Sequence, residues 1–139
     1  MGVRRATESD LEAIHPLLEE LVPAENGRSR AAWSEALTKD GYAAWIAEVD
    51  GVPAGFVDLL LFHDVAHGAT VGLINNLVVD ARFRGRGLGT RLLGEAIHHC
   101  RRQRAAEVHV WTDFDNARAI GLYERLGFAR RALLLELQI

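Results

Sequence analysis

Residues 77–90 decide how this 139-residue chain is interpreted, and they read Leu77-Val78-Val79-Asp80-Ala81-Arg82-Phe83-Arg84-Gly85-Arg86-Gly87-Leu88-Gly89-Thr90. The apolar start predicts a buried strand, and the apolar spacing after Gly87 predicts a helix. The turn between them has glycines at alternate positions, which lets the backbone approach a ligand closely. Free N–H groups and the dipole at a helix start favour an anion, and three arginines add positive charge. The stretch therefore predicts a phosphate or pyrophosphate site.

Two common phosphate-binding motifs do not fit this turn. A P-loop requires a lysine after its second glycine, and the turn contains none. A Rossmann fingerprint requires a third glycine where Thr90 stands, and it normally opens a parallel βαβ unit. The pattern that fits is R-x-x-G-x-G, formed by Arg84, Gly87 and Gly89. A glycine-rich surface turn that carries arginines is the alternative that this stretch alone leaves open.

Apolar periodicity and turn residues predict the order β-α-α-β-β-β-α-β-α-β in a single domain over residues 1–139. The expected strands are Val3–Ala6, Tyr42–Val49, Val52–Phe62, Thr70–Val79, Glu107–Thr112 and Phe128–Leu137. The expected helices are Leu11–Leu21, Ser29–Lys39, Leu88–Arg104 and a last one from Asn116 to Leu126. Asp50-Gly51 predicts a hairpin, and Pro16 is expected to kink or divide the first helix. The fold class is thus α/β, with an antiparallel meander followed by a crossover helix.

Composition narrows the class of protein. The chain is 49% apolar and 25% charged, with a formal net charge of −3, and a generic nucleic-acid binder would be basic throughout. No apolar run is long enough to suggest a membrane span, and no apolar segment follows the N-terminal charges as in a signal peptide. The lone Cys100 fits a reducing compartment, so we expect a cytoplasmic protein in which this thiol is buried and inert.

A second motif follows downstream and reads Asn116-Ala117-Arg118-Ala119-Ile120-Gly121-Leu122-Tyr123-Glu124-Arg125-Leu126-Gly127-Phe128. It looks like N-x-x-A-x-x-L-Y-E-x-x-G-F of the GNAT superfamily of N-acetyltransferases. The order of the elements and the strand-turn-helix stretch resemble the same family, so the resemblance covers nearly the whole chain. It implies the GNAT acyl-CoA N-acyltransferase fold, with acetyl-CoA as the co-substrate.

The resemblance also implies roles for individual residues. The pyrophosphate of coenzyme A would lie on Arg84, Gly85, Arg86, Gly87, Leu88, Gly89 and Thr90. The pantetheine arm would pair with the backbone of Leu77, Val78 and Val79. Asn116 would contact the cofactor, and Tyr123 would protonate the departing thiolate. Seven residues separate these two side chains, which is two helical turns or about 10.5 Å along one face. Taken alone, Asn116 also fits helix capping and Tyr123 also fits a core position.

The general base is harder to assign. One branch of the family reads Ile-Glu-Asp-Leu where this chain reads Ile74-Asn75-Asn76-Leu77, and an amide does not accept a proton usefully near neutral pH. Three alternatives follow: the acceptor amine has a lowered pKa, a water chain carries its proton to another acceptor, or Asn75 orients the substrate or the thioester while catalysis relies mainly on proximity. Asp58, on the preceding strand, is a possible substitute for the base and a weak candidate for substrate contact, and an exposed strand position is the favoured interpretation. His63 and His67 lack a third ligand, so no metal is expected.

The expected reaction is direct transfer of an acetyl group from acetyl-CoA to a primary amine in a ternary complex. The acceptor would be a small molecule or a peptide, with no nucleic acid or membrane as partner. Two alternatives remain, an acyltransferase that uses a longer acyl-CoA and a catalytically weak CoA-binding sensor. The apolar run Ala132 to Leu137 fits either internal packing or pairing across a homodimer.

Overall fold

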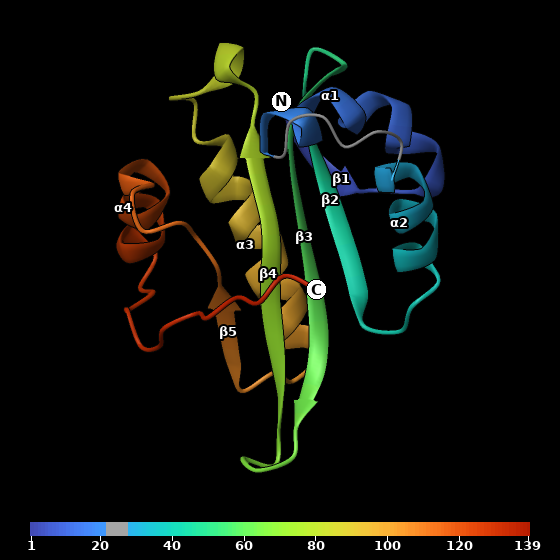
Figure 1. Cartoon of the computed structure of the whole chain (residues 1–139). Helices are drawn as coiled ribbons and strands as arrows, with labels where there is room; N and C mark the ends of the chain where they lie inside the picture. Colours follow the sequence, from blue (N-terminus) through green and yellow to red (C-terminus); the bar gives the residue numbers. More distant parts are fainter. Residues whose placement is uncertain (22–27) are drawn as a thin grey trace.

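The computed structural model describes residues 1–21 and 28–139. They form one five-stranded sheet with helices on both of its faces (Figure 1). The strands are β1 (Gly2–Arg5), β2 (Tyr42–Val49), β3 (Val52–Asp64), β4 (Ala69–Val79) and β5 (Glu107–Val110). The helices are α1 (Leu11–Leu21), α2 (Arg28–Leu37), α3 (Leu88–Arg102) and α4 (Ala117–Arg125), with short 3-10 turns η1 (Glu8–Asp10) and η2 (Ala81–Phe83). None of the helices in these described ranges has the length and apolarity needed to cross a bilayer.

The sheet is mixed, in the order β1-β2-β3-β4-β5. The first four strands are antiparallel neighbours, and β5 lies parallel to β4. The parallel pair requires a crossover, which α3 supplies. The β4–β5 ladder ends where Ile74 lies opposite Val110. Among the residues that the structure describes, the second half of β4 is therefore paired with β3 alone.

Two apolar layers sit on opposite faces of the sheet because side chains alternate along each strand. Trp45 and Ala47 belong to the layer under α3 and α4, whereas Ala44 and Ile46 belong to the layer under α1 and α2. Cys100 is buried in the α3 layer, as predicted. Its sulfur occupies the space beside Gly72, where an added Cβ would lie 2.3 Å from Sγ.

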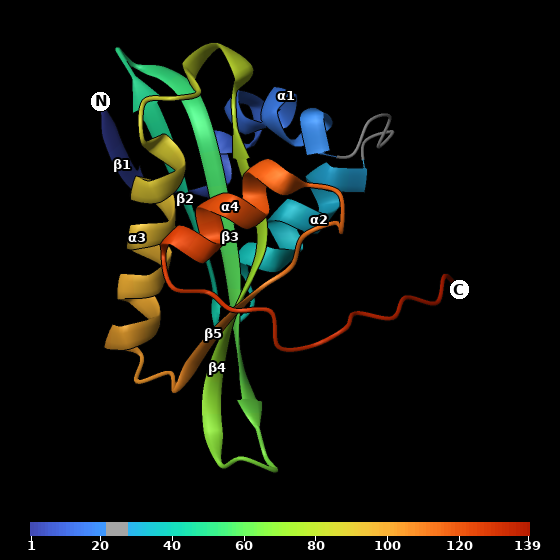
Figure 2. The same ribbon diagram turned by 90° about the vertical axis from the view of Figure 1, so that its left-hand side faces the viewer.

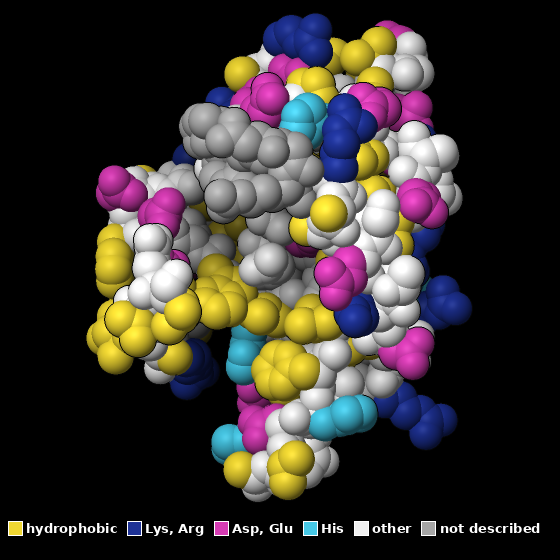
Figure 3. All heavy atoms as spheres, turned by 45° about the vertical axis from the view of Figure 1, so that its right-hand side comes forward, with side chains coloured by type: hydrophobic (Ala, Val, Ile, Leu, Met, Phe, Trp, Pro, Cys, Tyr) yellow, Lys and Arg dark blue, Asp and Glu magenta, His cyan; other side chains and the backbone are white. Residues whose placement is uncertain are grey.

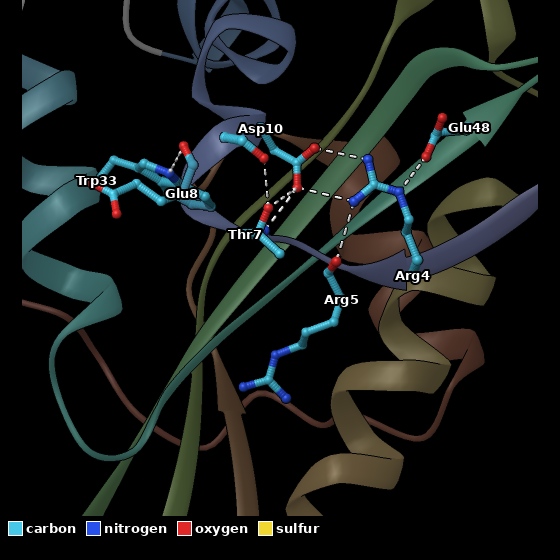
Figure 4. Close-up of polar contacts among 8 residues, drawn as sticks. Arg4, Arg5, Thr7, Glu8, Asp10, Trp33 and Glu48 are labelled. Atoms are coloured by element: carbon cyan, nitrogen blue, oxygen red, sulfur yellow. Dashed lines mark hydrogen bonds and ion pairs between the residues drawn. The ribbon is translucent and has the colours of Figure 1, made fainter.

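A buried carboxylate ties the N-terminal strand to the first helical turn (Figure 4). Asp10 accepts hydrogen bonds from the Arg4 guanidinium at 2.8 and 3.0 Å and from the backbone N–H of Thr7 at 2.7 Å. The Arg4 hydrogen bonds lower the pKa of Asp10 to about 2. Arg4 also pairs with Glu48 of β2. This one arginine thus joins β1, η1 and β2.

The predicted order of the first nine elements is confirmed, and the expected tenth element is wrong. Pro16 lies inside α1 and does not divide it, and a kink at this position stays a prediction. The strand expected over Phe128–Leu137 does not form, because residues 129–139 pair with no strand among the described residues. Figure 2 shows this segment leaving the sheet and ending well away from it. An apolar alternating pattern indicates a strand, but a strand forms only where a second strand lies beside it and shares its backbone hydrogen bonds.

Candidate functional site

The turn between β4 and α3 presents unpaired backbone donors. Gly85 and Gly87 both have φ of 78°, a left-handed conformation that glycine adopts without strain. An added Cβ at either position would meet nothing within 4 Å. Within the described part of the chain, the N–H groups of residues 85–90 donate to no backbone carbonyl. The turn therefore offers donors to open space at a helix N-terminus, which suits an anion.

The three arginines of the turn differ in their partners. Arg82 binds the Asp80 carboxylate at 2.7 Å, and its hydrogen bonds lower the pKa of Asp80. Arg84 donates to the Val79 carbonyl at 3.1 Å and to Glu20 of α1 at 3.2 Å. Arg86 stacks 5.4 Å from the Phe83 ring centroid and forms no ion pair with a described residue. The positive charge at the turn is thus smaller than three arginines alone suggest.

The second motif forms α4, which packs against the start of α3. Asn116 caps this helix, since its Oδ1 accepts the N–H of Ala119 at 3.1 Å. A Cβ added at Gly89 would lie 3.1 Å from Cδ2 of Leu122. Gly89, the last glycine of the turn, is therefore a point of contact between the glycine turn and the second motif. The capping interpretation of Asn116 is confirmed, and its contact with a cofactor stays a prediction.

Tyr123 points into the layer between α4 and the sheet. It is buried, and its ring lies edge-on to Phe128 with 5.9 Å between centroids. Burial raises the pKa of its phenol above the ordinary value of 10.0. In residues 1–21 and 28–139, the hydroxyl has no hydrogen-bond partner, which leaves it free to act on a ligand.

The last residues of β4 offer a one-sided backbone edge. Leu77, Val78 and Val79 lie opposite Val57, Phe56 and Gly55 of β3. Their other side has no partner in β5, because that ladder ends at Ile74. An extended ligand binds such an edge as an added strand would. The pairing of these three residues with an extended cofactor arm stays a prediction.

A bulge in β4 sets the position of Asn75. The register passes from Asp58 opposite Asn76 to Leu59 opposite Ile74, so Asn75 is an extra residue outside the ladder. Asp58 accepts the backbone N–H of Asn76 at 2.8 Å and the Tyr42 hydroxyl at 2.7 Å. The Asp58 carboxylate thus accepts the backbone amide of the residue that follows the bulged Asn75.

The expectation that Asp58 is exposed is wrong. Its residue is only 5% exposed, because Tyr42 of β2 and Asn76 of β4 close over the carboxylate from either side. Burial raises the pKa of Asp58, against the opposing effect of the hydrogen bonds from Tyr42 and Asn76. Sequence reasoning missed Tyr42. The hairpin register could have indicated it, because Ala44 lies opposite Asp58. Tyr42, two residues from Ala44, therefore lies on the same face of the sheet as Asp58.

Asn75 is exposed and forms part of the wall of a hollow of about 260 Å³ between α2 and the sheet. The other lining residues are Ala36, Lys39, Tyr42, Leu59, Leu60 and Leu73. His63 and His67 lie at the far end of the β3–β4 hairpin, where His67 pairs with Asp64 at 2.7 Å. The described residues contain no group of three His, Cys, Asp or Glu side chains arranged for a metal ion.

Together, the mixed sheet, the glycine turn and the one-sided β4 define an α/β protein with a site suited to an extended, anionic ligand. Comparison with known proteins makes this specific. The model of the Acetyltransferase (GNAT) family matches residues 8–128, and the chain belongs to this family. It is 34% identical over 104 residues to an uncharacterized N-acetyltransferase of Methanocaldococcus jannaschii, covering 73% of this chain and 45% of that protein. It is 38% identical over 76 residues to mycothiol acetyltransferase of Gordonia bronchialis, covering 54% and 25%.

Solved structures agree with the fold. An aminoglycoside N-acetyltransferase, AAC(6')-Iy in complex with CoA, superimposes with a TM-score of 0.88 at 25% identity, over 99% of this chain and 93% of that one. A ribosomal-protein-alanine N-acetyltransferase from Brucella melitensis gives a TM-score of 0.84 at 18% identity, over the full length of both chains. The chain spans less than two thirds of the length of the curated relatives described above.

Proposed function

We propose that this protein transfers an acetyl group from acetyl-CoA to a primary amine by direct attack within a ternary complex. The observation that carries the proposal is that three features suited to one extended cofactor are neighbours in the fold. A turn of unpaired N–H groups at 85–90 adjoins the one-sided edge of β4, and the free Tyr123 hydroxyl lies on the helix that packs at Gly89. The names of the relatives above support acetyl transfer, and one of the solved relatives binds CoA.

In this proposal each part of the cofactor meets a matching part of the chain. The pyrophosphate accepts hydrogen bonds from the N–H groups of residues 85–90, with Arg84 and Arg86 adding charge. The pantetheine amides pair with the backbone of residues 77–79. Asn116 contacts the cofactor while it caps α4. The thioester then lies between the β4 bulge and Tyr123.

The chemical step exchanges one bond for another. The amine nitrogen attacks the thioester carbon, the C–N bond forms and the C–S bond breaks. Tyr123 donates its proton to the leaving thiolate, because its raised pKa keeps the phenol protonated at neutral pH. The amine enters as the neutral base and releases its proton to solvent, since no carboxylate stands at Asn75.

Asp58 acts as a positioning residue in this scheme. Its carboxylate already accepts hydrogen bonds from Tyr42 and Asn76, so its lone pairs hold the bulge and do not take the proton of the amine. The bulge in turn directs Asn75 toward the hollow beside α2. The walls of this hollow are largely apolar, which favours an acceptor that carries an apolar group next to its amine.

The experiment that tests this function is calorimetric titration of the purified protein with acetyl-CoA, free CoA and a longer acyl-CoA, followed by a free-thiol assay with a panel of amines. We expect micromolar binding of acetyl-CoA and thiol release with at least one amine. Tighter binding and faster turnover of the longer acyl-CoA would replace acetyl transfer with transfer of that chain. Binding without thiol release from any amine would favour a CoA sensor, and no binding would overturn the proposal.

A further inference from the structure

The hollow beside α2 is the space that the proposed function leaves for the acceptor amine. Asn75, at the β4 bulge, forms one part of its wall, and the turn after α2 forms another. Its volume of about 260 Å³ lies just below the range of about 300–1,000 Å³ that is typical of pockets for drug-sized ligands. The hollow therefore suits an acceptor of about the size of an amino acid.

Lys39 carries the one charge on this wall among the residues that the structure describes. The other side chains that line the hollow belong to alanine, leucine, tyrosine and asparagine residues. In the space-filling view, which turns the α2 side of the molecule forward, hydrophobic side chains form a band across the middle of the face, and most charged side chains lie along its border (Figure 3). An acceptor with several positive charges would meet repulsion from Lys39 and no carboxylate among the described residues of the wall.

Backbone hydrogen bonds hold Lys39 at the rim of the hollow. Its N–H donates to the Ala36 carbonyl at 3.0 Å, and its carbonyl accepts the N–H of Tyr42 at 3.3 Å. The Lys39 side chain is 61% exposed and lies 3.6 Å from Glu35, four residues earlier. An exposed ion pair at this spacing is weak, so the ammonium group can exchange Glu35 for the anionic group of a ligand.

Asp58 does not supply a carboxylate for a second amino group of the acceptor. It is buried, and the side chains of Tyr42 and Asn76 donate hydrogen bonds to it at 2.7 and 3.0 Å. Tyr42 lines the hollow, whereas Asp58 does not. A ligand in the hollow thus meets an ammonium group at the rim, apolar side chains along the wall and the Asn75 amide at the bulge.

We propose that the acceptor is a monoamine that also carries an apolar group and a carboxylate, as a hydrophobic amino acid does, and that Lys39 binds this carboxylate. The inference rests on the proposed function, which places the thioester near Asn75. The apolar group of the acceptor lies against Leu60 and Leu73, which are opposite each other in the β3–β4 ladder and both line the hollow. An ion pair is stronger beside such apolar walls than in bulk water. The same lysine makes polyamines poor acceptors.

The first test compares leucine, leucinamide and spermidine as acceptors in the free-thiol assay. Rates are expressed per concentration of neutral amine, because leucinamide loses its proton at a lower pH than leucine does. We expect kcat/KM for leucine to exceed that for leucinamide about tenfold, since the amide lacks the charge-assisted contact with Lys39. Spermidine should be the poorest acceptor of the three.

Two variants assign this preference to Lys39. In Lys39→Met the advantage of leucine over leucinamide should disappear. The matched control is Arg30→Met, which removes a positive charge from the same helix but outside the hollow, where Arg30 pairs with Glu12. Because an exposed charge away from the site is screened by salt, Arg30→Met should keep the advantage within about twofold of wild type.

A second measurement detects the contact without turnover. Lys39 is the only lysine of the chain, so mass spectrometry after treatment with an amine-acylating reagent reports the accessibility of its ammonium group directly. The compound 4-methylpentanoate has the apolar group and the carboxylate of leucine but no amine, and it should slow the labelling of Lys39. The neutral 4-methylpentanamide should not. Labelling of the N-terminal amine is the internal control and should stay unchanged with either compound.

Several results would overturn the proposal. They are a preference for leucinamide or spermidine, thiol release with none of the three amines, an undiminished preference for leucine in Lys39→Met, and labelling of Lys39 that 4-methylpentanoate does not slow. Calorimetry with acetyl-CoA separates this failure from failure of the proposed function. Intact acetyl-CoA binding alongside any of these results refutes the acceptor class alone, whereas absent binding refutes the acetyl transfer on which it rests.

Discussion

The backbone N–H of Asn76 donates a hydrogen bond of 2.8 Å to the carboxylate of Asp58 across the β3–β4 bulge. The Asn76 side chain reaches the same carboxylate at 3.0 Å, and the Tyr42 hydroxyl holds its other oxygen. The bulge leaves Asn75 outside the ladder, and the amide of the next residue donates to a buried carboxylate. The strand distortion beside the candidate active site is thus maintained by side chains of β2 and β3.

Substitutions of Asp58 distinguish a positioning role of this residue from a role as general base. Asp58→Ala leaves the half-buried Asn76 N–H and Tyr42 hydroxyl without a partner, and we expect it to lower the free energy of unfolding by about 1–3 kcal/mol in total. Asp58→Asn keeps an oxygen for the Asn76 N–H, so it should retain turnover within about tenfold and leave the pH profile unchanged. Denaturant titration and steady-state kinetics measure both effects. A loss of 10²–10⁴-fold in kcat for Asp58→Asn, the range typical of a lost general base, would contradict the positioning role.

Substitution of Gly87 should weaken cofactor binding more than it destabilises the fold. Gly87→Ala places a Cβ in the open space in front of the turn and forces alanine to a φ of 78°, at a cost of about 1–2 kcal/mol. The matched control is Gly94→Ala on the exposed face of α3, where an added Cβ meets nothing within 4 Å and should stabilise by about 0.5–1 kcal/mol. Calorimetry with CoA should show weakened binding for the first variant alone. Equal affinities for the two variants would place the pyrophosphate elsewhere.

Removal of the Tyr123 hydroxyl should affect chemistry and little else. The hydroxyl has no hydrogen-bond partner in the described chain, so Tyr123→Phe preserves packing against Phe128. We expect kcat to fall about 10²–10⁴-fold, with the affinity for CoA within about twofold of wild type. Because burial raises the phenol pKa above 10.0, wild-type kcat should show no basic limb from this group below pH 10. Undiminished turnover in Tyr123→Phe would remove Tyr123 as the acid.

The Asp10–Arg4 pair should make stability depend on pH in the acid range. The pKa of Asp10 is lowered from 3.8 to about 2, so the unfolded chain binds its proton more tightly than the folded protein does. The resulting stabilisation, about 2 kcal/mol, is complete above pH ~4 and is lost as pH falls through about 2. Urea titrations of wild type and Asp10→Asn should therefore differ at pH 6 and converge near pH 2. A difference that stays constant with pH would exclude this linkage.

Much of the fold was predictable because its signals are local. The Asp50-Gly51 turn adopts the two positive φ values that its residue types favour. Asn116 caps α4 because its short side chain reaches the first free N–H groups. The glycine turn follows a buried strand, as its pattern indicates, and Gly85 and Gly87 take the left-handed conformation that glycine permits.

Other features depend on residues that are distant in the chain, so no local pattern contained them. Asp58 is buried because Tyr42 and the β4 bulge close around it, although its place in the sequence resembles that of an exposed strand residue. Arg84 donates a hydrogen bond to Glu20 of α1, which lies sixty-four residues away in the chain.

By itself, the sequence determined the helices, the first five strands, the turn conformations and the two family motifs, since backbone sterics and side-chain periodicity act over a few residues. Only the tertiary structure decided which charges are paired, which carboxylate is buried and which strand pattern acquires a neighbour. Residues 129–139 show the limit most clearly. Their alternation of leucines indicates a strand, but hydrogen bonds between strands require a second segment in register, and no such segment lies beside them among the described residues.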